Sequence, residues 1–265
     1  MPQQTSKMNA EVKRYWEKEP CGTHGYVVKD AGKFSLDYFE LVESYRYSVE
    51  PFIHGIAQFT RYRGKKVLEV GVGAGTDHLQ WARAGAELYG VDLTDAAIET
   101  TSKRLELYGF KSQLYRVDAE TLPFEDCTFD VVYSWGVIHH SEHPERILAE
   151  INRVLKKDGG VFIGMFYHRF SLTTLRVWLK HAFLKGRPWR SFSDVLFHHV
   201  ESIGTKAYSR KELETLFAEF GDLELKPLLT VGDTHRLPAG LIPFIPDQFG
   251  WFWGIRATKD RNHPT

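Results

Sequence analysis

The 265-residue sequence has few cysteines, and they stand far apart. Only Cys21 and Cys127 are present, and neither belongs to a CxxC pair or to a zinc-type spacing. This excludes a framework of several disulfides and favours a reducing, cytoplasmic compartment. The histidines form no HExxH motif, so we expect no metal site.

The sequence also lacks an excess of either charge and any long apolar run. Lys plus Arg and Asp plus Glu are both 34, so the formal net charge is zero, and we expect no nucleic-acid partner. No run approaches the roughly 18 apolar residues of a membrane span, and the first 20 residues lack the basic and apolar regions of a secretory signal. We therefore expect a cytoplasmic protein without stable membrane insertion.

From Lys66 onward, short apolar runs alternate with amphipathic stretches. Strands are predicted at 66–72, 86–93, 112–119, 129–135 and 159–167, and helices at 76–85, 94–109 and 144–157. Pro144 near its start and Gly159 and Gly160 beyond its end delimit the last of these helices. This alternation is typical of βαβ units and of a parallel sheet with helices on both faces, an α/β fold.

The chain divides into four predicted parts. Residues 1–63 are expected to form an N-terminal helical cap, 64–167 a ligand-binding core, 168–206 a helical lid insertion and 207–265 the completion of the sheet. The insertion is read as helical because a structureless loop of that length is uncommon in a compact domain. In the last part, Ser209 and Glu212 predict a capping box, and 223–231 and 251–259 predict two strands.

The stretch "VLEVGVGAGTD", residues 67–77, brings Gly71, Gly73 and Gly75 directly after the first strand. Glycines at a strand-to-helix turn let backbone N–H groups approach a ligand closely. A P-loop would need Lys followed by Ser or Thr, which is absent, and a dinucleotide fingerprint would need Gly where Thr76 stands. The Glu69 carboxylate would repel a pyrophosphate and favour a cationic nucleoside.

Asp92 lies at the carboxyl end of the second predicted strand, 21 residues beyond Gly71. A carboxylate there can accept hydrogen bonds from both hydroxyls of a ribose, as it also does in NAD enzymes. An NAD-dependent oxidoreductase therefore stays open as an alternative, weakened by Thr76 and Glu69.

The pattern of Glu69, Gly71, Gly73 and Gly75 resembles the first motif of class I S-adenosylmethionine (SAM)-dependent methyltransferases. Asp92, the "VDAE" stretch at 117–120 and residues 129–160 follow in the order of that family, in a form similar to the ubiquinone and menaquinone methyltransferases. The resemblance is strong over 64–167 and loose over 206–259. It implies SAM as cofactor and a Rossmann-like, seven-stranded, mostly parallel sheet whose last strand is antiparallel. The cofactor-binding residues it implies are Glu69, Gly71, Gly73, Gly75, Asp92, Leu93, Asp118, Ala119, Glu120, Ser134 and Trp135.

The chemistry that the resemblance implies asks little of the enzyme beyond alignment. The sulfonium of SAM is already an excellent leaving group, so the protein aligns the acceptor for in-line displacement and excludes water. A hydroxyl acceptor benefits from a general base, and His139 and His140 lie where the family places its site. They can equally shape the loop or contact the substrate. On this basis O-methylation is preferred over N- or S-methylation.

The acceptor is expected to be a small aromatic or amphipathic molecule, because aromatic residues concentrate in the two segments that fold over such a site. The candidate substrate contacts are Tyr15, Tyr26, Tyr45, Tyr47, His168, His198 and His199. Residues 175–190 mix Leu, Trp and Phe with Lys and Arg, which suits either a membrane interface or a covering helix with a basic outer face. A monomer or homodimer is expected, and a non-catalytic SAM-binding protein is the remaining alternative.

Overall fold

The structure is a computed structural model that describes residues 6–18 and 20–260. Its N-terminal part is helical, with α1 (Lys7–Lys18), α2 (Gly25–Val28), α3 (Leu36–Val49), α4 (Ile53–Ala57) and the 3₁₀ helix η1 (Phe59–Tyr62). Helix α3 starts where Ser35 accepts a hydrogen bond from the Tyr38 amide, and Asp37 in its first turn faces the positive end of the helix dipole.

The described residues contain eight strands in one sheet, in the order β3-β2-β1-β4-β5-β8-β7, with β6 paired to β5. Strands β1 to β5 are parallel, and β8 runs antiparallel to both β5 and β7. This confirms the predicted Rossmann-like sheet with an antiparallel last strand, although the two-residue β6 adds to the seven strands expected. The strands are β1 (Lys66–Val70), β2 (Glu87–Asp92), β3 (Gln113–Arg116), β4 (Val131–Trp135), β5 (Val161–His168), β6 (Ala207–Tyr208), β7 (Phe220–Leu228) and β8 (Phe252–Lys259).

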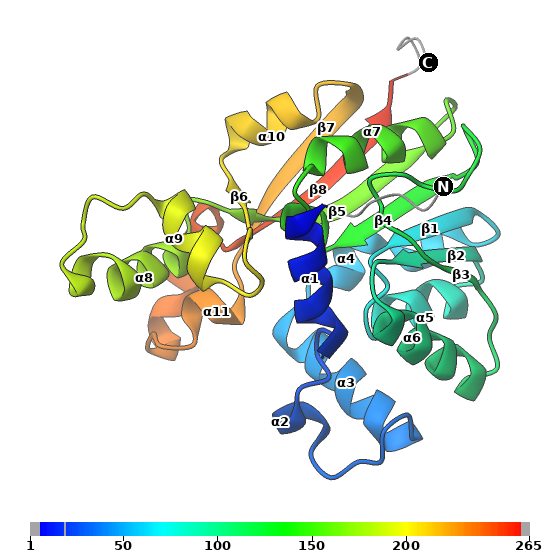
Figure 1. Ribbon diagram of the computed structural model, residues 1–265, viewed down its shortest axis with the longest axis horizontal. Coiled ribbons are helices and arrows are strands. Elements are labelled where there is room, and N and C mark those ends of the chain that lie inside the picture. Colours follow the sequence, from blue (N-terminus) through cyan, green and yellow to red (C-terminus); the bar gives the residue numbers. More distant parts are fainter. Residues whose placement is uncertain (1–5, 19, 261–265) are drawn as a thin grey trace.

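Helices cover both faces of the sheet (Figure 1). Helices α7 (Pro144–Val154) and α10 (Arg210–Leu216) lie on one face, and α5 (Thr76–Arg83) and α6 (Asp95–Leu107) lie on the other with α4. The predicted capping box of Ser209 and Glu212 is present at the start of α10. Helix α7 ends before the predicted residue 157 because Leu155 turns into a parallel bridge with Phe129.

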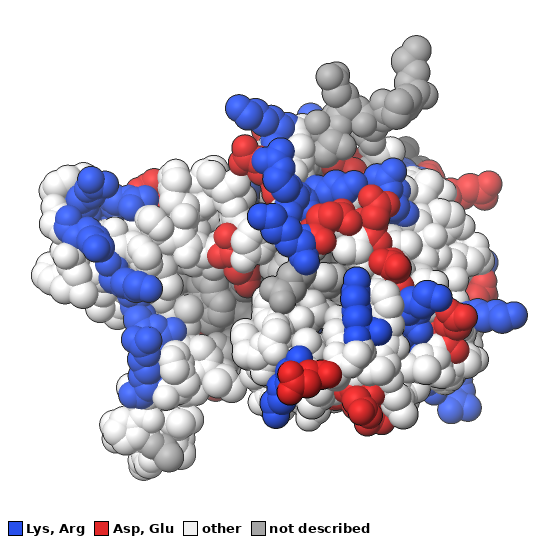
Figure 2. Space-filling model, turned by 60° about the horizontal axis from the view of Figure 1, so that its bottom comes forward, with Lys and Arg blue, Asp and Glu red and all other residues white. Residues whose placement is uncertain are grey.

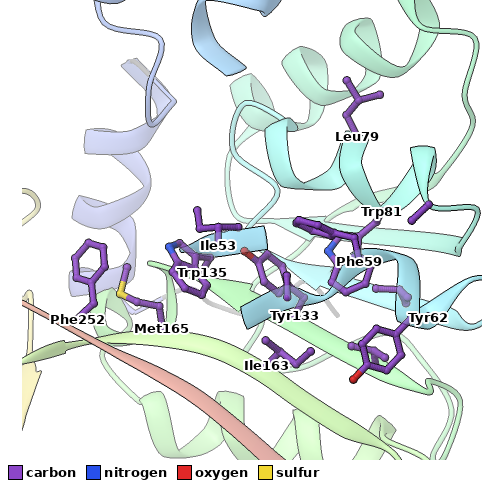
Figure 3. Close-up of a cluster of buried hydrophobic side chains, with 14 of the residues drawn as sticks. Ile53, Phe59, Tyr62, Leu79, Trp81, Tyr133, Trp135, Ile163, Met165 and Phe252 are labelled. Atoms are coloured by element: carbon purple, nitrogen blue, oxygen red, sulfur yellow. The ribbon is translucent and has the colours of Figure 1, made fainter. Parts of the chain in front are cut away.

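The alternation of side chains along the strands divides the core between the two faces. Tyr133 and Trp135 of β4 point into a cluster with Phe59 and Trp81 (Figure 3), whereas Val132 packs on the opposite face beneath α7. Fully burying an aliphatic or phenyl side chain contributes about 1.5–3 kcal/mol. The two clusters hold the strand ends, and thus the site, in a fixed frame.

A group of helices lies beyond the carboxyl ends of the strands, at the left of Figure 1. It contains α8 (Leu172–His181), η3 (Phe183–Lys185), α9 (Phe192–His199), α11 (Val231–Thr234), η4 (Ala239–Phe244) and η5 (Asp247–Phe249). We call residues 170–200 and 231–249 the lid lobe.

The second half of the lid lobe differs from the sequence prediction. Residues 207–265 were expected only to complete the sheet, but 231–249 leave it as a helical excursion between β7 and β8. Thr173 Oγ1 donates a hydrogen bond to Asp233 Oδ1 at 2.7 Å, and Arg176 donates to the Gly232 carbonyl at 2.6 Å. The excursion is therefore bonded to α8, while the division of the chain into four parts stays a prediction.

Candidate active site

A cavity of about 440 Å³ lies at the carboxyl ends of the strands. This is the edge at which open α/β sheets bind ligands, and the volume lies within the roughly 300–1,000 Å³ of small-molecule sites. Of the residues predicted from the sequence, the cavity is lined by Glu69, Gly71, Gly73, Asp92, Leu93, Asp118, Ala119, Trp135, Tyr26, Tyr45 and His140.

The three glycines of the first turn have different roles. Gly71 has φ +83°, and a Cβ on it would lie 2.2 Å from Cγ2 of Val137. Gly75 has φ +71°, and its Cβ would lie 2.8 Å from Oγ1 of Thr101, so these two glycines allow the chain to pack tightly. Gly73, at φ +52°, has no atom within 4 Å of its Cβ position and faces the open cavity. Gly75 packs against α6 and does not line the cavity, so its contact with the cofactor stays a prediction.

The Asp92 carboxylate is held rigidly at the end of β2. Its Oδ1 accepts hydrogen bonds from the amide and the hydroxyl of Thr94 at 2.9 and 2.8 Å, and its Oδ2 accepts one from the Gly73 amide at 3.1 Å. Burial raises the pKa of Asp92, and these hydrogen bonds oppose the rise. Each carboxylate oxygen has two lone pairs, so Oδ2 keeps one free and can still accept a hydrogen bond from a ribose hydroxyl.

Helix α1 is hydrogen-bonded to the segment that follows β3 through Asn9, a residue that was not predicted from the sequence. Asn9 Nδ2 donates hydrogen bonds to Asp118 Oδ2 at 3.1 Å and Glu120 Oε1 at 2.7 Å, and its Oδ1 accepts one from the Glu142 amide at 2.9 Å. Ser141 Oγ also donates to Glu120 at 2.7 Å. Asp118 lines the cavity. Glu120, a predicted cofactor contact, does not line it and instead accepts the hydrogen bonds from Asn9 and Ser141.

The Glu69 carboxyl group is paired inside the protein. Its Oε2 lies 2.9 Å from Nδ1 of His78, whose Nε2 lies 2.9 Å from Oγ of Ser112. Burial and the neighbouring Asp77 raise the pKa of Glu69 well above its ordinary value, and burial lowers the pKa of His78 to about 3. The pair is neutral as a unit. The expectation that Glu69 offers a negative charge to the ligand therefore needs correction, because burial keeps its carboxyl group protonated beside the neutral His78.

Other carboxylates supply the negative charge of the cavity. Arg46 of α3 lies 2.9 Å from Asp77 and 3.1 Å from Glu50, and Trp135 Nε1 donates a hydrogen bond to Glu50 at 2.6 Å. With Asp92 and Asp118, the cavity carries more carboxylates than Arg46 and Lys13, which also lines it, can balance. This donor set fits SAM, whose sulfonium and amino groups are positive and whose ribose needs acceptors. No sequence motif marks Arg46 or Glu50.

The far end of the cavity is aromatic. The ring of Tyr167 stacks on that of Trp251 at a centroid distance of 4.3 Å, and the hydroxyls of Tyr26 and Tyr45 lie 3.2 Å apart. The aromatic residues lining the cavity are Trp16, Tyr26, Tyr45, Trp135, Tyr167, Trp251 and Phe252. They form a wall suited to an apolar or aromatic acceptor.

A carboxylate lies between this wall and His140. Glu201 Oε2 accepts a hydrogen bond from the Tyr167 hydroxyl at 2.8 Å and lies 3.2 Å from Nε2 of His140. Nδ1 of His140 lies 3.1 Å from the Ser202 hydroxyl. Burial favours a raised pKa for Glu201, but the contacts with His140 and Tyr167 outweigh it and lower the pKa. Glu201 is thus ionised near neutral pH, and its side chain keeps 35% exposure toward the cavity.

The second predicted base is placed differently. His139 is fully buried beside Tyr167, with a ring distance of 4.0 Å, and it does not line the cavity. Burial and then His140 lower the pKa of His139 well below its ordinary value. Because it cannot reach a ligand in this arrangement, the structure disfavours it as the base.

Several other predicted site residues lie outside the cavity lining. Ser134 donates to the Val70 carbonyl inside the sheet, and Tyr47 donates to Asp77 beneath the cavity. Nδ1 of His168 lies 3.0 Å from the Gly250 carbonyl. Tyr15, His198 and His199 are exposed on α1 and α9. Packing against the sheet or exposure on a helix explains each placement. Among the described residues, no group of three or more His, Cys, Asp or Glu side chains is placed to hold a metal ion.

Comparison with known proteins assigns the family of the core. Residues 68–163 match the family model described as "Methyltransferase domain". The phthiotriol/phenolphthiotriol dimycocerosates methyltransferase of Mycobacterium leprae (strain TN) is 40% identical over 108 residues, which are 40% of this chain and 39% of that protein. This core is a class I SAM-dependent methyltransferase domain.

One further sequence relative and one solved structure extend the comparison. The phosphatidylethanolamine N-methyltransferase of Cereibacter sphaeroides is 34% identical over 109 residues, 40% of this chain and 53% of that protein. The structure of magnesium protoporphyrin IX methyltransferase from Synechocystis PCC 6803 with bound SAH has a TM-score of 0.60 at 13% identity and covers 96% of this chain and 100% of that one. The fold thus extends over nearly the whole chain, whereas the sequence match spans about two fifths of the length of the Mycobacterium relative.

Proposed function

We propose that this protein transfers the methyl group of SAM to a hydroxyl oxygen of a small amphipathic acceptor. The observation that carries the proposal is a single cavity with two chemically distinct ends. One end presents Gly73, Asp92 and Asp118, which would hold the nucleoside. The other end is an aromatic wall with the Glu201 carboxylate beside it.

Glu201 and His140 are the residues that we assign to the removal of the proton from the acceptor hydroxyl. In the displacement, a lone pair of the acceptor oxygen forms the new O–CH₃ bond while the S–CH₃ electron pair returns to sulfur. The hydroxyl proton becomes strongly acidic as this bond forms, so an ionised carboxylate suffices to take it. We infer that Glu201 accepts the proton and that His140 and Tyr167 position it. The sequence alone pointed to His139 or His140 as the candidate base.

The relatives support an amphipathic acceptor. The Mycobacterium and Cereibacter proteins bear the names of lipid methyltransferases, and the Synechocystis protein that of a porphyrin methyltransferase. All three names describe acceptors with a large apolar part. An aromatic wall that ends in a carboxylate matches that chemistry.

Transfer to an amine is the second candidate. Glu50 and Glu201 lie among aromatic rings, an arrangement that also attracts a cation. The two candidates predict different kinetics for Glu201→Gln. For a hydroxyl acceptor kcat falls by about a hundredfold or more, within the usual range for a general base. For a cationic amine the main effect is a raised KM.

The test begins with transfer of a labelled methyl group from SAM across a pooled extract of lipids and small metabolites. Mass analysis of the labelled product then identifies the acceptor and the methylated atom. Glu201→Gln and His140→Gln are compared with Glu145→Gln, an exposed carboxylate of α7 outside the cavity. Normal kcat and KM in Glu201→Gln, with affinity for S-adenosylhomocysteine intact, would reject the proton assignment.

A further inference from the structure

We propose that the lid lobe docks on the surface of an anionic lipid bilayer. The first observation is an excess of cations in the lobe. The lid lobe contains six Lys or Arg and three Asp, and within it residues 170–193 contain five Lys or Arg and no Asp or Glu, although the whole chain has a formal net charge of zero. The rest of the chain therefore carries an excess of three negative charges. An anionic surface would attract the lobe and repel the remainder, which fixes one orientation.

The cations are displayed on the surface of the lobe. Figure 2 shows Lys and Arg side chains in a line down the lobe at the left, with very few acidic side chains beside them. Lys180, Lys185 and Arg187 are exposed, whereas Arg169 and Arg190 form ion pairs with Glu212 and Asp194. At least three cations are thus available to lipid headgroups.

Large apolar side chains are exposed between these cations. Leu184 is 75% and Trp189 77% exposed in the turn after α8, next to the exposed Phe183. The turn is held in place, because Trp178 Nε1 donates a hydrogen bond to the Arg190 carbonyl at 2.7 Å. Its apolar tips therefore point outward from a fixed support. Leucine and aromatic side chains beside Lys and Arg are the composition of interfacial membrane segments.

The second half of the lobe adds to this apolar surface. After α11, which is hydrogen-bonded to α8, Leu241 and Phe244 of η4 are exposed, Phe244 by 81%. Large exposed apolar side chains in both halves of one lobe are typical of an interaction surface. None of the helices in residues 6–18 and 20–260 is both long and apolar enough to span a bilayer. The contact proposed is consequently peripheral.

The two halves of the lobe also lead into the walls of the cavity. Glu201 follows α9 directly, and Trp251 follows η5. Docking through the lobe therefore brings the aromatic end of the cavity close to the membrane. The docking itself does not depend on the proposed methyl transfer and is measured without it.

The test is co-sedimentation of the full chain with vesicles of phosphatidylcholine alone or mixed with phosphatidylglycerol. We expect binding to the mixed vesicles that weakens as salt is raised, and little binding to phosphatidylcholine alone. Replacing Lys180, Lys185 and Arg187 with Gln should lower the partition coefficient by at least about tenfold, since each cation near an anionic surface contributes about a fivefold factor.

An apolar variant tests insertion separately. Phe183→Ser, Leu184→Ser and Trp189→Ser together should also lower binding by at least about tenfold, because each side chain loses burial in the interface. The matched controls are Lys111→Gln with Lys157→Gln and Leu107→Ser, which change exposed residues away from the lobe and should bind like the wild type. Intact circular dichroism and S-adenosylhomocysteine affinity show that the lobe variants are folded.

Three outcomes overturn the proposal. The first is equal binding to neutral and anionic vesicles, and the second is unchanged binding in both lobe variants. The third is binding of an RNA or DNA oligonucleotide to the lobe without any vesicle binding, which would assign the cations to phosphates of another polymer.

Discussion

The cavity-facing position of Gly73 can be tested by adding a single methyl group. Gly73 and Gly109 both have positive φ, +52° and +73°, and neither has an atom within 4 Å of its Cβ position. Gly73 lines the cavity, whereas Gly109 follows α6 outside it. Gly109→Ala is therefore a matched control for the backbone effect of Gly73→Ala.

Both substitutions should cost similar stability. An L residue in the left-handed region costs about 1–2 kcal/mol, and the reduced entropy of the unfolded chain returns about 0.4–1 kcal/mol. We expect a net loss of roughly 1 kcal/mol in each variant, measured by urea unfolding. Only Gly73→Ala places its methyl group in ligand space. Crowding of about 1–3 kcal/mol there corresponds to roughly a fivefold to hundredfold loss of affinity for S-adenosylhomocysteine.

Calorimetric titration of the wild type and both variants measures these affinities. We expect wild-type affinity for Gly109→Ala and a clear loss for Gly73→Ala. If the two variants bind S-adenosylhomocysteine equally well while losing equal stability, the cofactor does not approach Gly73, and the glycine turn has only a packing role.

Three further predictions concern the frame of the cofactor end. Asp92→Ala should weaken S-adenosylhomocysteine binding by at least about tenfold in calorimetry, because hydrogen bonds to a charged group contribute about 1.5–3 kcal/mol; unchanged affinity would contradict the ribose assignment. Asn9→Ala should lower the free energy of unfolding by about 1–3 kcal/mol in urea titrations, since two part-buried carboxylates lose their donor, and an unaltered midpoint would show that α1 is held otherwise. The folded pair of Glu69 and His78 holds one proton, because burial keeps Glu69 protonated and His78 neutral, with a pKa of about 3. The unfolded chain holds two protons on these groups below about pH 4.5, so stability should fall on acidification from there toward pH 3. His78→Gln should flatten this fall, and identical slopes would show that other groups cause it.

The fold could be predicted from the sequence because its signals are local. Short apolar runs indicated the strands, and the amphipathic stretch that begins at Pro144 indicated α7, whose buried residues include Ile147, Leu148 and Ile151. The helical excursion at 231–249 escaped prediction. Its Pro and Gly residues and its irregular apolar pattern are typical of a loop. Its position is fixed by hydrogen bonds to α8 between residues about 60 positions apart in the sequence, such as Thr173 and Asp233.

The site could be predicted only in part, because some of its residues belong to a motif and others come from distant segments without one. Residues on the strand ends, such as Asp92 and Asp118, belong to a motif with fixed spacing and do line the cavity. Asn9, Arg46 and Glu201 reach it from segments that carry no motif, so only the tertiary structure brings them in. The pairing of Glu69 with His78 is also invisible in a motif, because it depends on both side chains being buried together.

The distribution of charge connects the two ends of the molecule. The cavity collects carboxylates, which suits a cationic cofactor, whereas the lid lobe collects cations and exposed apolar side chains. The aromatic wall that includes Tyr167 and Trp251 lies where these two regions meet. If the acceptor reached the wall from water, the exposed apolar surface of the lobe would have no role and would only lower the solubility of the protein. An amphipathic acceptor drawn from a bilayer would use the lobe and the wall together, with its apolar part still near the lipid and its polar group beside Glu201.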